Sequence, residues 1–471
     1  MEIFYPILVS LFFVLVSFSL CFAFFKSKPS IEGNLPPGQR GWRVIGESLE
    51  FLTIGWNGHP EKFIFDRMTK FSHNVFRNSL MLEDVAVFCG PTGNKFLFSN
   101  ENKLVRAWWP ASASVQKLSP SYDQSMKNIN ILRKYFKPQA LQKYVPIMDM
   151  VAQKHFETEW EGNDQIVTHN VTKKFTFLAA CKIFISIDEP EQAKYLLGLF
   201  EKIYPAVFSV PIDLPGTRLR RALNTIIAMR KELSEIIKQR KIDLADGNVS
   251  PTQDILSQIL CDDDGKFMDE SEISDMIIML LMGGYENTSS TCDFIVKYLA
   301  ESPEIYEEVY KEQTEIARSK ASTKLLTQTE VSKMKYSWNV ACEVLRLTSP
   351  VRGTFREAID TFVYKEYSIP KGWKLYWSAN ATHKNPDFFP DPERFDPSRF
   401  DHKAPAPYTF VPFGGGPHLC PGQEYARMQI LVFMHHLVRK FKWREVFPNE
   451  QIIFGPTPKL AKGLPILIYP N

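Results

Sequence analysis

The chain has 471 residues, of which 44% are hydrophobic and 23% are charged, as in a globular protein that buries a large core. The 32 prolines are scattered, which excludes a collagen-like or disordered chain, and the net charge of only +3 argues against a dedicated nucleic-acid-binding protein. The seven cysteines contain no C-x-x-C pair, so neither a zinc ribbon nor a disulfide framework is indicated.

The first predicted element is an apolar stretch from Ile3 to Phe25. About 20 such residues in a helix cross a hydrocarbon core of roughly 30 Å, so we expect a single transmembrane anchor. Lys26 and Lys28 follow it, and the positive-inside rule then leaves the rest of the chain in the cytosol. A cleaved signal peptide is the alternative, but a charged n-region and a small-residue cleavage site are missing. A Pro-rich hinge at 26–40 leads to a globular body at 41–471.

Helices are predicted to dominate the body, with a smaller β portion toward the C-terminus. Asp269 and Glu272 are expected to form a capping box at the start of a helix that reaches Leu299. Apolar residues lie on all sides of this helix, which predicts that it runs through the protein interior. Strand-like segments follow at 361–377, with Pro370-Lys371-Gly372 as the expected hairpin turn. The other predicted helices are 146–160, 218–245, 304–318 and 331–347.

The most informative segment is a glycine-rich loop from Phe413 to Gly422 that contains Cys420. A predicted helix follows, so Cys420 lies at a helix N-terminus, where the dipole and free N–H groups favour a thiolate. Glycines let a flat group approach the backbone closely, and Phe413 can shield the sulfur. Such a loop suits a haem iron held by a cysteine thiolate. A zinc site is not indicated, because His418 and Cys420 lack a second pair of ligands.

Three motifs together resemble the cytochrome P450 superfamily. They are the F-x-x-G-x-x-x-C-x-G pattern of this loop, the E-x-x-R pair Glu343 and Arg346, and a P-E-R-F segment that contains Arg394. Glu343 and Arg346 are one helical turn apart, and Arg394 can complete a three-member ion cluster with them. The resemblance covers essentially the whole chain. It implies the cytochrome P450 fold, mainly α with a smaller β portion, behind the single N-terminal transmembrane helix.

Finer segments are similar to the plant branch of that family that oxidises pentacyclic triterpenes such as β-amyrin. These are 355–358 (FREA), 369–373 (IPKGW) and 406–410 (APYTF). The resemblance implies haem b (iron protoporphyrin IX), with Cys420 as the axial iron ligand and Arg356 on a propionate, for which a guanidinium is well suited. The other residues expected around the haem are Phe413, Gly416, His418 and Gly422.

The sequence departs from the family pattern at three places. In the long helix Asn287 follows Glu286, where the family has a threonine, and Thr288 is turned about 100° further around the helix. Asparagine can hold a water but cannot replace a hydroxyl that both donates and accepts. His418 replaces the usual arginine of the haem loop. Ile129 replaces the arginine that faces the other propionate, with Arg133 or Lys127 as substitutes outside the expected register.

The substrate chamber is expected to be apolar, as suits a hydrocarbon skeleton. Arg352 is unusual beside Pro350; either it meets a carboxylate or hydroxyl on a substrate that is already oxidised, or it points to the surface. The residues assigned to the chamber by position are Trp108, Trp109, Phe208, Val210, Leu281, Val351 and Thr354.

The resemblance implies a haem-thiolate monooxygenase of the endoplasmic reticulum membrane that oxidises a lipophilic terpenoid. Glu286, Asn287 and Thr288 are the expected catalytic residues, which organise the water that delivers protons. The partners are O2 and NADPH–cytochrome P450 reductase, and no nucleic acid is expected. Residues predicted to dock the reductase are Lys134, Lys137, Arg439, Lys440 and Lys442.

Two alternatives remain open at this point. A haem-thiolate isomerase or dehydratase acting on a peroxide would need neither O2 nor the acid–alcohol pair, and it would consume no NADPH. A catalytically degenerate haem-binding membrane protein would hold haem without turnover.

Overall fold

The computed structural model describes residues 33–42, 46–81, 83–110, 122–207, 209, 211–262, 268–319, 324–401, 404–455 and 457–471, together with Val16. Within these ranges no helix is long and apolar enough to span a bilayer. The predicted anchor at 3–25 lies outside the described residues, apart from Val16. The end of the hinge is described: the N–H of Arg77 donates to the carbonyl of Pro37 at 2.8 Å, which ties the hinge to strand β1 (Val75–Leu80).

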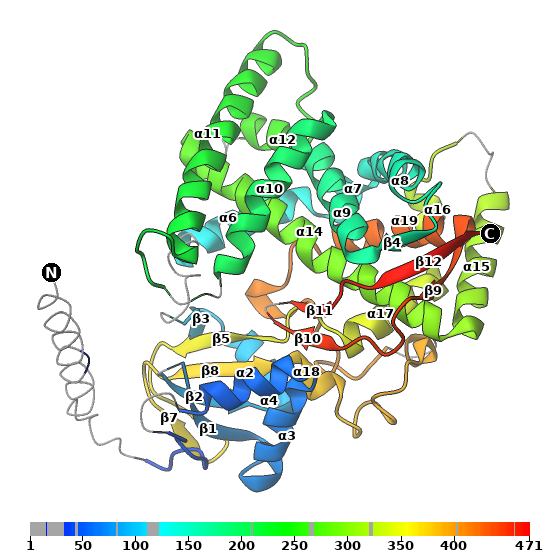
Figure 1. The fold of residues 1–471 in the computed structure, drawn as a ribbon. Helices are drawn as coiled ribbons and strands as arrows, with labels where there is room; N and C mark the ends of the chain where they lie inside the picture. The colour runs from blue at the N-terminus through cyan, green and yellow to red at the C-terminus, as the bar shows by residue number, and fades with distance from the viewer. Residues whose placement is uncertain are drawn as a thin grey trace, which may run out of the picture.

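A smaller part of the molecule is built on a five-stranded sheet (Figure 1). The strand order is β1, β2 (Glu83–Phe88), β8 (Lys374–Ser378), β5 (Gly353–Ala358) and β3 (Val105–Trp108). Only β2 and β8 pair in parallel, and they bring distant parts of the chain together. The helices of this part are α2 (Ser48–Trp56), α3 (Pro60–Lys70), α4 (Gly90–Ser99) and α18 (Ala379–His383).

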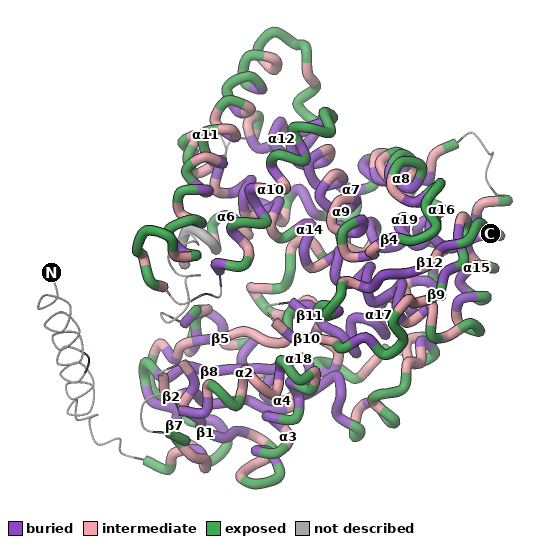
Figure 2. Tube along the Cα trace, in the orientation of Figure 1, coloured by how far each residue is buried: buried purple, intermediate pink, exposed green. Residues whose placement is uncertain are grey.

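The larger part is helical, and it surrounds α14 (Glu270–Glu301). The predicted capping box of Asp269 and Glu272 is confirmed at its start. Figure 2 shows that α14 runs through the buried interior, where it packs on α9 (Thr168–Ile185), α11 (Arg218–Ala245), α17 (Lys335–Leu347) and α19 (Gln423–Lys440). The other α-helices of the described ranges are α6 (Tyr122–Tyr135), α7 (Pro138–Leu141), α8 (Val145–Glu159), α10 (Pro190–Val207), α12 (Ile255–Cys261), α15 (Pro303–Arg318) and α16 (Gln328–Val331).

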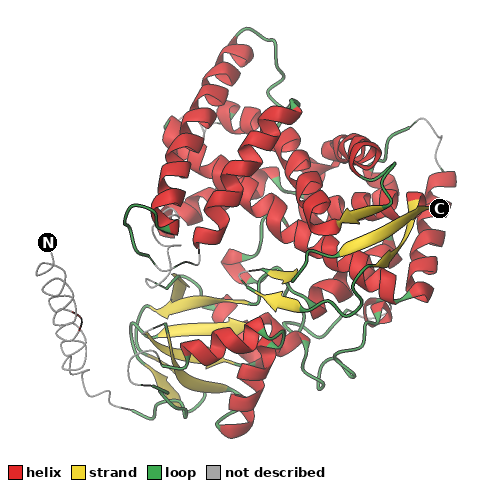
Figure 3. Ribbon diagram, in the orientation of Figure 1, coloured by secondary structure: helices red, strands yellow, loops and turns green. Residues whose placement is uncertain are grey.

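Figure 3 shows the mainly α fold with a smaller β portion that the sequence predicts. The predicted helix 331–347 is divided, because α16 ends at Val331 and α17 begins at Lys335. Three short sheets complete the described fold: β4 (Gln165–Val167) with β12 (Pro465–Pro470) and β9 (Phe441–Glu445), β10 (Ile452–Phe454) with β11 (Pro458–Leu460), and the hairpin of β6 (Phe362–Tyr364) and β7 (Tyr367–Ile369).

The predicted hairpin turn at Pro370-Lys371-Gly372 is wrong. The hairpin joins β6 (Phe362–Tyr364) to β7 (Tyr367–Ile369) and turns at Lys365, which has a φ of 56°. A two-residue hairpin turn requires positive φ, whereas proline fixes φ near −65°. The Pro-Lys-Gly turn instead leads from β7 to β8, which belongs to a different sheet.

The predicted ion cluster forms, but with a different third member. Arg346 donates to both oxygens of Glu343, at 2.7 and 2.8 Å, and both side chains are fully buried. The Nε of Arg399 lies 3.3 Å from Oε1 of Glu343. Arg394 is exposed and contributes only its backbone carbonyl, which accepts a bond from Arg346 at 3.3 Å. Arg394 lies in a loop and Arg399 in a short 3₁₀ helix (Pro397–Phe400), and no helical or strand period covers both, so the sequence did not show which one turns inward.

Candidate active site

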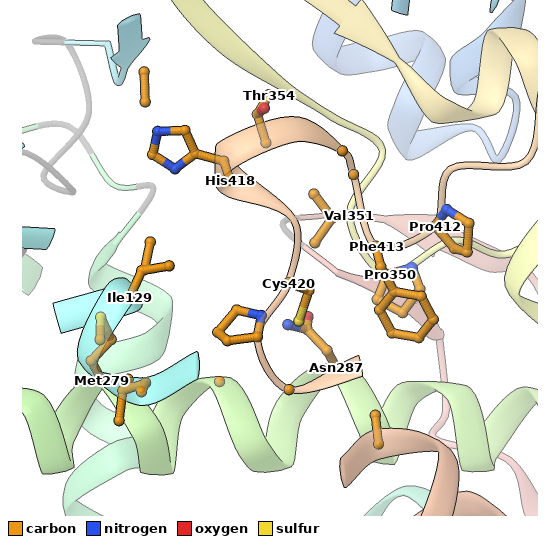
Figure 4. A pocket seen from close by; sticks show the side chains of 18 of the residues that line it. Ile129, Met279, Asn287, Pro350, Val351, Thr354, Pro412, Phe413, His418 and Cys420 are labelled. Carbon is orange, nitrogen blue, oxygen red and sulfur yellow. The ribbon is translucent and has the colours of Figure 1, made fainter. Parts of the chain in front are cut away.

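A cavity of about 900 Å³ lies between the sheet part and the helical part. Its wall is contributed by β3, β5, α6, α14, α19 and the loop that carries Cys420, and it is mostly apolar (Figure 4). This volume is near the upper end of the roughly 300–1,000 Å³ that is usual for ligand pockets. An aromatic wall of Phe136, Phe184 and Tyr425 lines one side, with ring centroids 5.1–6.0 Å apart.

Cys420 opens onto this cavity from a tightly folded loop. Its N–H donates to the carbonyl of Phe413 at 3.0 Å, and α19 begins three residues later at Gln423. Burial raises the pKa of the Cys420 thiol, while a hydrogen bond from the Gly422 N–H opposes this increase. The Gly422 N–H at the start of α19 thus favours a thiolate, against the desolvation of the sulfur. A bound metal ion would supply the missing stabilisation, because a coordinating thiol is deprotonated outright.

Glycines give the loop its close packing. Gly416 has a φ of 64°, and a Cβ at this position would collide with the carbonyl of Phe98 on α4. Gly416 itself does not line the cavity, whereas Phe413, His418 and Gly422 do. The glycine therefore shapes the loop from behind.

On the opposite wall, α14 presents Asn287 and Thr288 to the cavity, along with Gly283 and Gly284. A Cβ at Gly283 would meet nothing within 4 Å, so the helix backbone borders open space there. Neither the Asn287 amide nor the Thr288 hydroxyl has a hydrogen-bond partner among the described residues, which leaves both available to a water or a ligand.

Glu286 points away from the cavity. Its Oε2 lies 3.3 Å from Nζ of Lys173 on α9, and both side chains are largely buried. Burial and the neighbouring Glu286 carboxylate raise the pKa of Tyr285, so the phenol keeps its proton. The predicted acid thus lies on the far side of α14 from the amide and the hydroxyl that face the cavity.

A charged corner lies where β5 meets the Cys420 loop. Arg356 and His418 both line the cavity. Between them lies Glu101, which is 1% exposed on its side chain; Arg356 donates to it at 2.5 Å, and Nε2 of His418 lies 3.4 Å away. Glu101 was not predicted from the sequence. No local signal marks it, since its partner Arg356 is 255 residues away.

Ile129 lines the cavity from α6, as its predicted register requires. The two proposed substitutes for an arginine there are occupied elsewhere. Arg133 donates to the carbonyl of Pro417 behind the loop, and Lys127 lies 3.7 Å from Glu272. The described part of this wall therefore offers no arginine or lysine to the cavity.

Four of the residues predicted for the chamber line the cavity: Trp108, Trp109, Val351 and Thr354. Leu281 does not, since it is fully buried on another face of α14, and Phe208 and Val210 lie outside the described residues. Arg352 also does not line the cavity; its Nη2 donates to the carbonyl of Gly455 at 2.9 Å, and burial lowers its pKa. The side chain thus turns toward α2 and the β10–β11 turn.

The basic residues predicted to dock a reductase are mostly paired with other side chains. Lys134 lies 3.8 Å from Asp262, and Lys440 is 2.6 Å from Glu161. Lys442 is 3.2 Å from Glu307, and Arg439 contacts His435 at 2.9 Å. Lys137 is exposed just before α7. Paired surface lysines of this kind carry a weak net field.

The residues present fit a haem. A cysteine thiol faces a large apolar cavity, the backbone of α14 is bare at Gly283, and Arg356 at the rim can meet a carboxylate. Cysteine sulfur is an established axial ligand of haem iron, and arginine is the residue best shaped for carboxylates.

Comparisons with known proteins agree with this geometry. The sequence model of the cytochrome P450 family matches residues 36–461. The chain is 55% identical to the beta-amyrin 28-monooxygenase of Panax ginseng over all of both sequences. It is also 55% identical to that of Solanum lycopersicum, over 100% of this chain and 99% of the relative. The structure of retinoic acid-bound cyanobacterial CYP120A1 superposes with a TM-score of 0.81 at 30% identity, covering 93% of this chain and 100% of that one.

Proposed function

The chain belongs to the cytochrome P450 family and is a haem-dependent monooxygenase, and from that premise we propose that it oxidises a pentacyclic triterpene of the β-amyrin type. The observation that carries the proposal is the 55% identity over the full length of beta-amyrin 28-monooxygenases. The large apolar cavity that ends at Cys420 supports it, since a rigid hydrocarbon skeleton needs such a chamber. The O2-independent isomerase and the degenerate haem protein are not favoured, because these relatives are monooxygenases.

The haem, when bound, supplies the activation of O2 and the transfer of one oxygen atom to the substrate. Cys420 would hold the iron, and its thiolate would donate electron density toward it. Phe413, which lines the cavity on the same loop, would shield the sulfur from water. Arg356 and His418, which both line the cavity, would hold a propionate of the haem.

Asn287 and Thr288 hold the water that serves oxygen activation. The Asn287 amide can both donate to and accept from a water, and the Thr288 hydroxyl adds a group that does both in one atom. We place the ion pair of Glu286 and Lys173, on the side of α14 that faces α9, at the outer end of the proton path. In the proposed relay the Asn287 amide holds a water at the position where the family has a hydroxyl, and the neighbouring Thr288 hydroxyl exchanges protons with that water.

Trp108, Trp109 and Val351 position the substrate through apolar contact alone. The electrons come from NADPH through a reductase, which we place on the face where Cys420 lies closest to the surface. We further propose that the N-terminal segment 3–25 anchors the enzyme in the endoplasmic reticulum membrane with its body in the cytosol. An anchored body suits a substrate that partitions into lipid.

The test is co-expression with a plant reductase in yeast that makes β-amyrin, with products identified by mass spectrometry. We expect an oxidised β-amyrin whose oxygen carries label from ¹⁸O2. The matched control is Cys420→Ala, which cannot hold the iron. Conversion without NADPH, or haem-loaded enzyme that leaves every pentacyclic triterpene unchanged, would contradict the proposal.

A further inference from the structure

Glu101 joins the two cavity residues best placed to meet a haem carboxylate. It lies in the connection between α4 and β3 and accepts a bond from Nε of Arg356 at 2.5 Å through Oε2. Its other oxygen, Oε1, is 3.4 Å from Nε2 of His418. Three segments far apart in sequence thus meet at one carboxylate that is 1% exposed.

The remaining bonds of Arg356 fix the direction of its guanidinium. Nη1 donates to the hydroxyl of Thr354 at 2.8 Å and to the carbonyl of Phe355 at 2.9 Å. Thr354 in turn accepts from the indole of Trp377 at 2.9 Å. Within the described residues Nη2 has no protein partner, so one edge of the guanidinium remains available to a ligand in the cavity that Arg356 lines.

The carboxylate of Glu101 is ionised at neutral pH. Burial raises its pKa, but the hydrogen bond with His418 and the charge of Arg356 outweigh this effect, so the net pKa is lowered. A fixed negative charge therefore lies at the rim of the cavity. A buried charge of this kind acts through a low dielectric and is felt strongly by neighbouring groups.

We propose that Glu101 is a positioning residue of the haem site, with a second, electrostatic role. Its carboxylate holds Arg356 and His418 in the orientation that meets a haem propionate, and its charge keeps the reduction potential of the iron low. This inference rests on the proposed function, since it requires the bound haem. The electrostatic reason is that one-electron reduction adds negative charge to the haem, which a nearby carboxylate opposes.

A purely structural role is the competing explanation. Glu101 also forms a β-bridge with Val105, so it could serve only to pin the start of β3. Three substitutions separate the two roles. Glu101→Gln keeps an acceptor but removes the charge; Glu101→Asp keeps the charge but shortens the reach; Glu101→Ala removes both.

The matched control is Glu47→Gln. Glu47 is also a buried carboxylate on an arginine, with Nη2 of Arg67 2.8 Å away. It contacts Asn78 on β1, at the opposite edge of the five-stranded sheet from β3, and it does not line the cavity. Losing either ion pair should lower the melting temperature, but only Glu101 should affect the iron.

The measurements use the full-length holoenzyme: the midpoint potential by spectroelectrochemical titration, and the rate of haem transfer to apomyoglobin. We expect Glu101→Gln to move the potential to more positive values while haem loss stays within about twofold of wild type. Glu101→Asp should keep the wild-type potential. Glu101→Ala should show both the positive shift and haem loss faster by about tenfold, as expected when a charge-assisted hydrogen bond no longer orients Arg356.

An unchanged potential in Glu101→Gln would overturn the proposal, as would an equal shift in Glu47→Gln. If Glu101→Gln does not retain haem, the midpoint potential of Glu101→Asp tests the proposal instead. A shifted potential in this variant, which keeps the charge, would show that the charge is not the cause and would overturn the electrostatic role. Failure of the proposed function would give a different result. The wild-type holoenzyme would hold haem, and the Glu101 variants would show the expected shifts in potential, but no triterpene would be oxidised.

Discussion

Arg399 and Arg394 lie close together in the sequence, yet only Arg399 reaches the buried carboxylate of Glu343. Its Nε is 3.3 Å from Oε1, and its side chain is 12% exposed. Replacing Arg399 by alanine leaves Glu343 paired with Arg346, so the carboxylate is not stranded. The loss is the ion pair with Glu343 and the hydrogen bond from Nη2 to the carbonyl of Asp391 at 3.0 Å, together about 1.5–3 kcal/mol of unfolding free energy. Arg394→Ala should cost no more than about 0.5 kcal/mol, because its exposed side chain leaves while the backbone carbonyl stays.

The assay is equilibrium unfolding in urea, followed by circular dichroism on both variants. Glu343→Gln provides an upper reference, since it leaves Arg346 buried without its carboxylate and should cost about 3–5 kcal/mol. The expected order of destabilisation is Glu343→Gln, then Arg399→Ala, then Arg394→Ala. A loss in Arg394→Ala as large as that in Arg399→Ala would refute the assignment of the third cluster member.

Four further predictions concern the site and its surroundings. Asn287→Thr restores a group that donates and accepts through one atom, so product formed per NADPH should rise and hydrogen peroxide should fall; unchanged peroxide would contradict the role of the amide. Lys173→Met removes the partner of Glu286 and should lower turnover by about 100-fold with an unaltered haem spectrum, as expected for a lost proton-transfer group; unaltered turnover would exclude this relay. Cys420→Ser should lose the thiolate-type spectrum of the reduced carbon monoxide complex, and a retained spectrum would assign the ligand elsewhere. The pKa of Glu357 is lowered: burial raises it, but hydrogen bonds and charge from Lys374 and Arg106 outweigh burial. The ionised Glu357 therefore stabilises the folded state above its unfolded pKa of roughly 4.3, and this contribution is lost as pH falls through the folded pKa. In urea unfolding at a series of pH values, Glu357→Gln should therefore show a smaller loss of unfolding free energy on acidification than the wild type.

Local patterns were sufficient for much of the molecule. The capping box at Asp269, the apolar helix that follows it and the loop around Cys420 were all predicted from short windows of sequence. In each case the signal is carried by neighbours along the chain: a capping side chain bonds within its own turn, and the glycines that shape the loop surround the cysteine. The family resemblance followed from the same windows, and the match over residues 36–461 confirms it.

Other features depended on contacts across the fold. The choice of Arg399 over Arg394 depends on which side chain turns toward Glu343, and the hairpin turn at Lys365 depends on which strands pair. Glu101 had no local signal, because its partners Arg356 and His418 come from other segments. Helix period and motif spacing describe neighbours along the chain. The partners of a buried charge are different. Desolvation makes an unpaired buried charge costly, so such a charge must be paired in the folded state, and its partners can come from any part of the chain.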